Sequence, residues 1–343
     1  MSSKNAQLVL GPESITILPR SIVMTRILRQ ELKEMTRALF DFIFYGHPES
    51  FCSYTETPDE DDISLFIDED SLGRYFPDLP AASGQAYRAI RVYEGAETLE
   101  VYGYINFLSA SLAEHGVEVV YLGTFYADLL LVPDESVQQA HAQVIASLES
   151  LQTLSDMRPP SPAIPSVSSL DGQQRPGTSH LSDASISMIY GCQSGADGGA
   201  DISLAKLPSQ LQLGSFPRDA LPQISYQLLR VLLRTDANRF FSYTASANEI
   251  TFVAERLDLA LLTEASLPQL IALPTQWSVL QLNAGSNGAS KNTVSNVSKI
   301  LAEHMIGIFY LSTFNYDFIF TPSSKTDLAI KALVESDPTI TFN

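Results

Sequence analysis

The sequence predicts an α+β fold in which four βαββαβ-like modules are arranged as two duplicated halves. Two internal repeats lead to this prediction. LAEHGVEVVYLGTFYADLLLVP, beginning at Leu112, and LAEHMIGIFYLSTFNYDFIFTP, beginning at Leu301, are identical at ten of 22 aligned positions. FCSYT at Phe51 likewise recurs as FFSYT at Phe240. Both pairs have the same offset in numbering (301 − 112 = 240 − 51 = 189), so the whole N-terminal half is predicted to recur as the C-terminal half.

The first module is predicted to begin with a strand pair around Leu8 to Leu18. An amphipathic helix follows from about Ile27 to Phe44, where apolar residues recur at i, i+3, i+7 and i+11. The segments FCSYT and ISLFI are rich in β-branched and aromatic residues and predict two strands with an acidic hairpin between them. A short helix near Leu72 to Tyr75 completes the module.

The second module is predicted to contain a strand over Tyr87 to Tyr93 and a helix from about Tyr104 to His115. The hairpin VEVVYL/YADLLLV and a helix from about Glu135 to Leu151 follow. Because the same patterns return at the repeat offset, the third and fourth modules are predicted to follow this order as well.

A stretch between the two halves has a different composition. The run MRPPSPAIPSVSSLDGQQRPGTSHLSDAS is rich in Pro, Ser and Gly, and it cannot bury enough apolar surface to offset the entropy cost of ordering it. We therefore expect a disordered linker. The predicted boundaries are 1–85 and 86–152 for the first two modules, 153–206 for the linker, and 207–270 and 271–343 for the last two modules.

Composition excludes several functions. The net charge is −18, with 21 Lys and Arg against 39 Asp and Glu, and this balance argues against a nucleic-acid partner. No apolar run reaches the length of a membrane span, and the N-terminal MSSKNAQ lacks a signal-peptide pattern, so no membrane insertion and a cytoplasmic location are expected. Cys52 and Cys192 are too few for a disulfide framework, which favours a reducing compartment.

No catalytic or metal motif is found. The chain lacks a phosphate-binding Gly-Lys-Ser/Thr loop, a dinucleotide glycine fingerprint after a strand, and a Gly-x-Ser-x-Gly nucleophile elbow. The acidic residues from Asp59 to Asp70 lack the ligand spacing of a calcium loop, and the histidines lack that of a zinc site. We expect a protein that is not an enzyme and holds no cofactor or metal.

Three segments carry a resemblance to a known family. TETPDEDDISLFIDED after FCSY, the LAEHGVEVVYLGTFYADLLLVPDES segment, and STFNYD resemble the CASTOR family, the tandem ACT-domain arginine sensors of animal cells. The resemblance covers nearly the whole chain outside the linker. It implies four ACT modules, a ligand between the second and fourth modules, a homodimer, and binding to the GATOR complex upstream of the TOR kinase.

The resemblance also implies ligand-binding residues. The family's Thr-Phe and Asp fall on Thr313, Phe314 and Asp317, whereas its Glu falls on Ser290 and its Ser on Glu118. These two changes weaken the case for arginine, so an amino acid or related metabolite of open identity is expected. A glycine-rich loop precedes the predicted helix that ends in the second LAEH segment. Backbone N–H groups at the N-terminus of such a helix are suited to bind an α-carboxylate. The full implied set is His115, Val117, Glu118, Val119, Asn287, Gly288, Ser290, Thr313, Phe314 and Asp317.

The family's partner-binding segment falls on Phe125, Tyr126 and Asp128, and two of these three positions differ from the family pattern. Asp128 and Asp317 also interrupt otherwise apolar strands, so each could instead be a structural anchor. The histidines at the two LAEH sites are placed where helix C-termini are expected, which favours a helix-end role. Three functions stay open: an amino-acid sensor, a ligand-free ACT-fold scaffold, and a regulatory subunit of an amino-acid biosynthetic enzyme.

Overall fold

The structure is a computed structural model of the chain. It describes residues 14–58, 60–81, 84–93, 104–156, 202–234, 238–264, 267–283 and 293–342.

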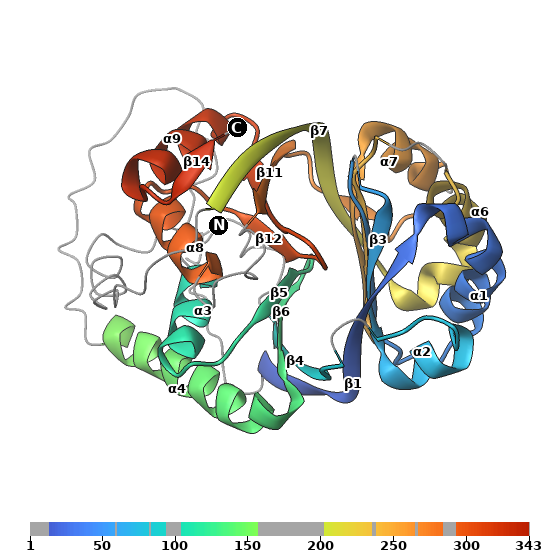
Figure 1. Ribbon diagram of the computed structural model, residues 1–343, viewed down its shortest axis with the longest axis horizontal. Helices are drawn as coiled ribbons and strands as arrows, with labels where there is room; N and C mark the ends of the chain where they lie inside the picture. The colour runs from blue at the N-terminus through green and yellow to red at the C-terminus, as the bar shows by residue number, and fades with distance from the viewer. Residues whose placement is uncertain are drawn as a thin grey trace, which may run out of the picture.

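The element order βαββα occurs four times along the chain, and we call these the first to fourth units (Figure 1). The first unit consists of β1 (Ile15–Leu28), α1 (Leu32–Tyr45), β2 (Cys52–Glu56), β3 (Asp62–Asp68) and α2 (Glu69–Tyr75). The second consists of β4 (Tyr87–Tyr93), α3 (Tyr104–Glu114), β5 (Val120–Gly123), β6 (Ala127–Pro133) and α4 (Val137–Asp156).

The other two units follow the same order. The third consists of β7 (Ile202–Pro217), α6 (Leu221–Leu232), β8 (Phe241–Ala245), β9 (Glu249–Glu255), α7 (Arg256–Thr263) and the two-residue β10 (Ile271–Ala272). The fourth consists of β11 (Trp277–Asn283), α8 (Thr293–Glu303), β12 (Phe309–Ser312), β13 (Asp317–Pro322), α9 (Thr326–Ser336) and β14 (Ile340–Phe342).

The long strands β1 and β7 each serve two units. The end of β1 pairs with β3, while its beginning pairs with β4 of the second unit. In the same way β7 pairs with β9 at its end and with β11 near its beginning. The prediction of a helix from Ile27 was therefore wrong at its start: β1 runs to Leu28, and α1 begins at Leu32. Ile27 is fully buried and hydrogen-bonded in the sheet, which outweighs its place in the helical pattern.

The strands form one 14-stranded sheet. Its order is β7-β11-β13-β12-β5-β6-β4-β1-β3-β2-β8-β9, and β9 pairs back with β7, so this path closes on itself. The two remaining strands, β10 and β14, pair with β7 outside the path. Closure satisfies backbone hydrogen bonds that free strand edges would leave open.

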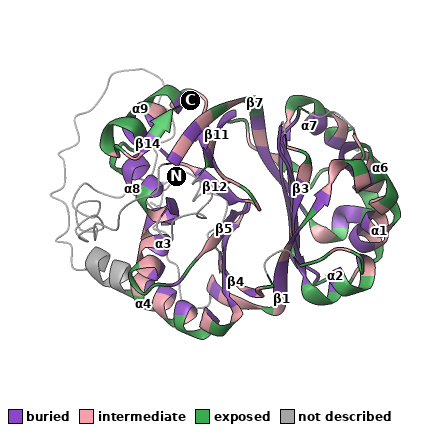
Figure 2. Ribbon diagram, viewed as in Figure 1, coloured by how far each residue is buried: buried purple, intermediate pink, exposed green. Residues whose placement is uncertain are grey.

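Figure 1 shows that the closed path is flattened into two facing sheets, with helices on the outside of each. Helices α1, α2, α6 and α7 cover the sheet of the first and third units, and α3, α4, α8 and α9 cover that of the second and fourth. One buried apolar cluster lies under each helical layer, and a third, rich in aromatic side chains, fills the space between the sheets. Burial is accordingly concentrated on the strands (Figure 2).

The predicted module boundaries stay a prediction, but the linker boundaries can be compared with the structure. Helix α4 continues to Asp156, and β7 begins at Ile202, so both ends of the predicted linker 153–206 belong to regular elements. Ile202 and Leu204 are buried in the outer cluster of the second and fourth units, which is why the strand starts earlier than composition suggested. Residues 157–201 lie outside the described part of the chain.

Candidate functional site

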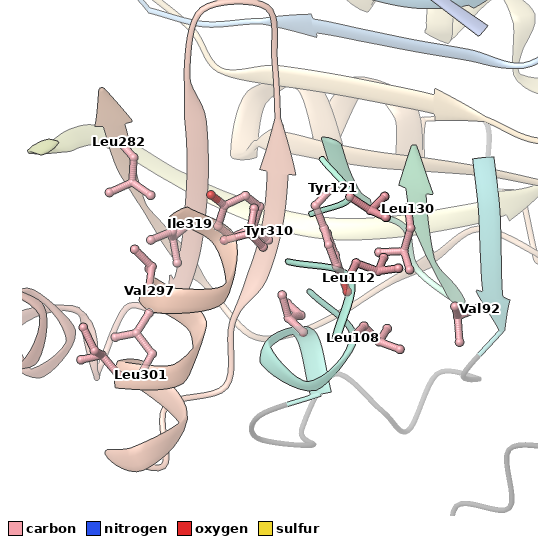
Figure 3. Close-up of a cluster of buried hydrophobic side chains, with 14 of the residues drawn as sticks. Val92, Leu108, Leu112, Tyr121, Leu130, Leu282, Val297, Leu301, Tyr310 and Ile319 are labelled. Carbon is pink, nitrogen blue, oxygen red and sulfur yellow. The ribbon is translucent and has the colours of Figure 1, made fainter. Parts of the chain in front are cut away.

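The second and fourth units meet about an approximate twofold axis. Strands β5 and β12 pair at Leu122 and Leu311, two positions related by the repeat offset (311 − 122 = 189). The rings of Tyr121 and Tyr310, related by the same offset, meet edge to face with centroids 5.9 Å apart. Figure 3 shows these tyrosines between the α3 and α8 sides of the cluster. Because equivalent residues meet each other, this junction is built from the duplicated segments of the sequence.

The helices above this junction obey the same symmetry. Helices α3 and α8 pack against each other, and the Ser295 hydroxyl lies 3.4 Å from the Asn106 side-chain oxygen. These two residues are again equivalent (295 − 106 = 189), and Asn106 is buried. The junction therefore places polar side chains from both halves in an otherwise apolar core.

Each tyrosine at the junction faces an aspartate of its own hairpin. The Tyr121 hydroxyl donates a hydrogen bond to the Asp128 carboxylate. The Tyr310 hydroxyl lies beside Asp317 in less favourable geometry. Asp317 is half-buried as a residue, but its carboxylate is enclosed. Burial raises the pKa of Asp317, and hydrogen bonding by Ser312 and Tyr310 offsets part of that rise.

The two histidines of the duplicated segment occupy equivalent helix ends. The Nδ1 atom of His115 is 2.9 Å from the carbonyl oxygen of Ser111, and that of His304 is 2.8 Å from the carbonyl oxygen of Ile300. His115 is exposed. Both rings thus satisfy a carbonyl group in the last turn of a helix, where such groups lack a backbone partner.

The residues after α3 alternate in exposure. Val117 is buried, Glu118 is exposed, and Val119 packs against the outer apolar cluster. The Glu118 side chain is therefore directed away from the core that contains the tyrosine pair. Of the remaining predicted ligand residues, Asn287, Gly288 and Ser290 lie outside the described part of the chain.

Thr313 and Phe314 form the tip of the β12–β13 hairpin, and this tip contacts the first unit. The Phe314 backbone N–H donates to the Ser64 hydroxyl over 2.9 Å, and the Arg26 guanidinium lies 5.4 Å from the centre of the Phe314 ring. The Thr313 hydroxyl donates to the carbonyl of Tyr316 within the turn. The structure thus places these two residues against the opposite sheet, whereas Asp317 faces the helical layer.

The predicted partner-binding segment forms the equivalent tip of the β5–β6 hairpin. The Phe125 backbone N–H donates to the Thr251 hydroxyl over 2.9 Å, so this tip is bound to the third unit. Phe125 is 2% exposed and Asp128 8%, while Tyr126 is half-buried. Neither Phe125 nor Asp128 presents its side chain at the surface. A backbone N–H at a buried hairpin tip needs an acceptor, and the hydroxyls of the facing sheet supply it.

A buried ionic cluster that the sequence did not predict lies between the first and third units. Arg239 is 1% exposed and donates two hydrogen bonds to Glu56, 3.0 and 2.7 Å long. Asp258 accepts from Arg239 and from Arg234. Arg29 also contacts Glu56 at 3.2 Å. Nothing in the local pattern distinguishes these charges from solvated ones, because they come from separate segments that meet only in the folded chain.

Comparison with known families identifies one segment of the chain. Residues 273–335 match the ACT domain family. The match runs from just before β11 to the end of α9, so it covers the fourth unit up to its last helix. An ACT domain is therefore present in the C-terminal part of the chain.

Solved structures give only distant likenesses. Aspartate kinase from Synechocystis is 12% identical with a TM-score of 0.34; the alignment covers 98% of this chain and 57% of that one. The chain thus spans little more than half the length of that enzyme. A protein from Agrobacterium tumefaciens is 20% identical over 41% of this chain and 92% of its own, with a TM-score of 0.31. Values of this size say nothing about what the chain binds.

Two features are absent from the part of the chain that the structure describes. Within it, no three His, Cys, Asp or Glu side chains come together as a metal site would require. No helix in the same ranges is both long and apolar enough to span a membrane.

Proposed function

We propose that the chain is a non-enzymatic sensor made of four ACT modules, which binds an amino acid or related small metabolite between the second and fourth units. The observation that carries the proposal is the junction itself. A matched ACT domain meets its duplicate there across a twofold arrangement, with enclosed polar groups from both halves.

Asp317 has the chemistry that such a ligand needs. A free amino acid presents an ammonium group, which binds best to a carboxylate with few other charged partners. Among the described residues no cation pairs with the enclosed Asp317 carboxylate, and burial raises its pKa. A bound ammonium group would favour the ionised form of Asp317 and so offset part of the free-energy cost of burying it.

Ligand binding would act on a partner by changing how the two halves fit together. A ligand shifts an equilibrium only when it binds one arrangement more tightly than another. A ligand bound at the junction would contact both halves, because each half supplies one tyrosine–aspartate pair there. The resemblance to the CASTOR family extends the proposal to a cytoplasmic homodimer that regulates a GATOR-like complex in TOR signalling. Arginine is one candidate ligand among the amino acids.

A ligand-free scaffold is the second candidate. It is favoured by the internal contacts of the hairpin tips, where Phe125 and Phe314 are used to join the units. The hydrogen bond from Tyr121 to Asp128 likewise gives that carboxylate a partner within the chain. In this case the junction polar groups would serve folding alone.

Thermal unfolding of the full chain with each of the twenty amino acids tests the proposal. A ligand present at 100 times its dissociation constant adds about 2.7 kcal/mol to the free energy of unfolding. Asp317→Asn should abolish the stabilisation, whereas Asp128→Asn, at the equivalent position of the other half, is the matched control. Stabilisation by no amino acid would favour the scaffold, and stabilisation unaffected by Asp317→Asn would place the ligand elsewhere.

A further inference from the structure

Of the nine buried side-chain atoms without a hydrogen-bond partner among the described residues, four belong to inner-face positions of strands that flank the tip of the β5–β6 hairpin. They are Thr16 Oγ1, Arg91 Nε, Ser215 Oγ and Glu249 Oε2. We call this group, together with Thr124 and Thr251, the Glu249 seat, because the tip of the β5–β6 hairpin rests on it. Buried polar groups are nearly always hydrogen-bonded, so four such atoms at these positions require a cause.

Strand alternation places all four side chains on the inner faces of the sheets. Arg91 shares its face with Ala89, which belongs to the cluster between the sheets, and Thr16 lies opposite Arg91 in register. Glu249 shares its face with Val253 of the same inner cluster. Ser215 lies opposite Thr251, the residue two positions from Glu249 on that face.

The seat contains two opposite charges that do not form an ion pair with each other. Burial raises the pKa of Glu249, and the hydrogen bond from Thr124 and then the Arg91 charge offset part of that rise. The nearest approach of the two groups nevertheless exceeds ion-pair distance, because neither joins an ion pair among the described residues. Glu249 Oε1 accepts from the Thr124 hydroxyl over 2.7 Å, while Oε2 accepts nothing.

The equivalent place in the other half is more open to solvent and is partly paired internally. Glu60 corresponds to Glu249 (249 − 60 = 189), and here the β12–β13 tip rests on the first unit. Arg26 pairs with Asp62 at 3.3 Å, and the Asn315 side chain donates to the same carboxylate. We call Arg26, Glu60, Asp62, Asn315 and Tyr316 the Glu60 seat. None of the unpartnered buried atoms among the described residues belongs to it.

The two seats share their backbone arrangement but differ in exposure and in side-chain chemistry. Arg91 pairs with Leu129 on β6, and the position that pairs with the equivalent Phe318 on β13 is Gln281. The second half thus has a neutral side chain where the first has a guanidinium. The Glu249 seat holds an acceptor and a donor of opposite charge that do not pair with each other.

We propose that the Glu249 seat is a binding site for a small amino carboxylate, separate from the junction around Asp317. The ammonium group of the ligand is held by Glu249 Oε2 and its carboxylate by the Arg91 guanidinium, with the Thr16 and Ser215 hydroxyls as additional partners. The Tyr93 and Tyr126 rings are stacked with centroids 6.5 Å apart, and Tyr126 belongs to the hairpin tip. A bound ligand would link β4 and the β5–β6 tip to the β8–β9 turn.

Calorimetric titration with a graded series of probes tests this site. Glycine, β-alanine and 4-aminobutyrate carry the same two charges at increasing separation, while methylamine and acetate carry one charge each. One member of the series should bind, and the single-charge probes should bind far more weakly. Removing one charged hydrogen-bond partner by Glu249→Gln or Arg91→Gln should weaken binding by about tenfold to a hundredfold. Glu60→Gln and Gln281→Leu are the matched controls in the other half, and both should leave binding unchanged.

Asp317→Asn separates this site from the proposed function. Binding that survives Asp317→Asn but is lost in both Glu249→Gln and Arg91→Gln supports the Glu249 seat, whatever the junction does. Binding lost in Asp317→Asn and retained in the other two variants would overturn it and leave the junction as the only site. Absence of binding by every probe would also overturn it, with ordered water as the occupant. The two seat variants lie on different sheets, and a cooperative unfolding transition in each confirms that the fold is intact.

Discussion

The two halves of the molecule use the same backbone contacts but different side-chain chemistry. Arg29 donates to the carbonyl of Thr57 over 2.7 Å, and the equivalent Arg218 (218 − 29 = 189) donates to the carbonyl of Ser246 over the same distance. Each arginine thus holds the turn on which a hairpin tip of the facing sheet rests. The element order and these turn contacts recur, whereas the groups behind them do not.

The difference is largest behind the two turns. Next to Arg29 lies the buried pair of Glu56 and Arg239, with 0% and 1% exposure. The equivalent positions in the other half are Ala245 and Ser50 (245 − 56 and 239 − 50 are both 189). One turn is therefore supported by charges, and the other by neutral groups. The repeated framework thus tolerates either solution when the buried groups have partners.

The strongest test of this comparison is Arg239→Met. Removing the guanidinium leaves Arg29 as the one cation paired with Glu56 and Arg234 as the one cation paired with Asp258 among the described residues, both carboxylates being fully buried. Glu56 keeps the hydrogen bond from the Tyr54 hydroxyl as well. Breaking a buried pair in this way costs about 3–5 kcal/mol of unfolding free energy. Urea denaturation measures the loss.

Ser50→Ala at the equivalent position is the matched control. The Ser50 hydroxyl is 3.2 Å from the Ser71 hydroxyl, and losing one neutral hydrogen bond costs about 0.5–1.5 kcal/mol. Equal losses in the two variants would contradict the claim that the halves are stabilised differently.

The next largest effect is expected at the junction of the second and fourth units. A Cβ atom at Gly123 would lie 2.7 Å from Phe309 Cε2 and 3.0 Å from the Tyr310 carbonyl oxygen. Gly123→Ala should therefore destabilise the protein by about 1–3 kcal/mol through overpacking. The equivalent residue is Ser312 (312 − 123 = 189), whose hydroxyl accepts from the Tyr121 backbone N–H.

Ser312→Ala is the control for Gly123→Ala, because it adds no atoms and removes only the hydrogen bonds of the Ser312 hydroxyl with the Tyr121 N–H and with Asp317. It measures the loss of hydrogen bonding without overpacking, about 0.5–1.5 kcal/mol for each bond. Both variants can be compared by urea denaturation. A Gly123→Ala protein as stable as the parent would show that the two strands can separate at the junction without cost.

Much of this architecture could be predicted from the sequence, because it depends on local pattern. The strands FCSYT and ISLFI, the strand over Tyr87–Tyr93 and the VEVVYL/YADLLLV hairpin have the predicted type and nearly the predicted bounds. The exception is β1, where apolar residues of the strand continue in phase with those of α1. Periodicity alone does not locate the change from strand to helix there, since tertiary pairing decides it.

The candidate site was harder to predict from the sequence, because it depends on contacts between separate strands and units. Asp128 and Asp317 are recognisable as carboxylates in apolar strands, but their tyrosine partners become evident only through strand register. Glu249 and Arg91 give no signal at all, because they come from separate units and meet through the closure of the sheet. Side chains that approach each other across modules leave no local pattern in the sequence.

Met305 offers a smaller test of the equivalence of the two halves. It has a φ of 53° after α8, and Gly116 has a φ of 70° after α3. Both precede the backbone hydrogen bond that closes the helix, from Val117 to Leu112 and from Ile306 to Leu301. The left-handed conformation costs a non-glycine residue about 1–2 kcal/mol, offset in part by the greater flexibility of unfolded glycine. Met305→Gly should therefore stabilise the protein by about 1 kcal/mol in urea denaturation, and a loss of stability would mean that the exposed Met305 side chain makes a contact of its own.

The smallest expected change in unfolding free energy is that of Glu249→Gln measured without ligand. Its direction follows from the pKa of Glu249. Burial raises the pKa of Glu249 in the folded protein above its unfolded value, so the folded state holds this proton more tightly. Stability contributed by that proton is present at low pH and is lost as the pH rises from the unfolded pKa of about 4.3 through the raised folded pKa. Above that range the parent carries a buried charge that the glutamine variant lacks, and the variant should be more stable by up to about 1 kcal/mol.

Unfolding free energies of parent and variant between about pH 4 and 8 measure this difference directly. Asp317 also has a raised pKa, but it is present in both proteins and cancels in the comparison. A difference in unfolding free energy between parent and variant that grows with rising pH and then stays constant identifies Glu249 as a buried group whose ionised form destabilises the folded protein. The equivalent Glu60→Gln should give a smaller difference, because Glu60 is less buried and has hydrogen-bonding partners in Tyr316 and Asn315. Equal differences in unfolding free energy for the two variants would mean that the two seats differ in geometry but contribute equally to stability. The unpartnered atoms of the Glu249 seat would then be satisfied by water.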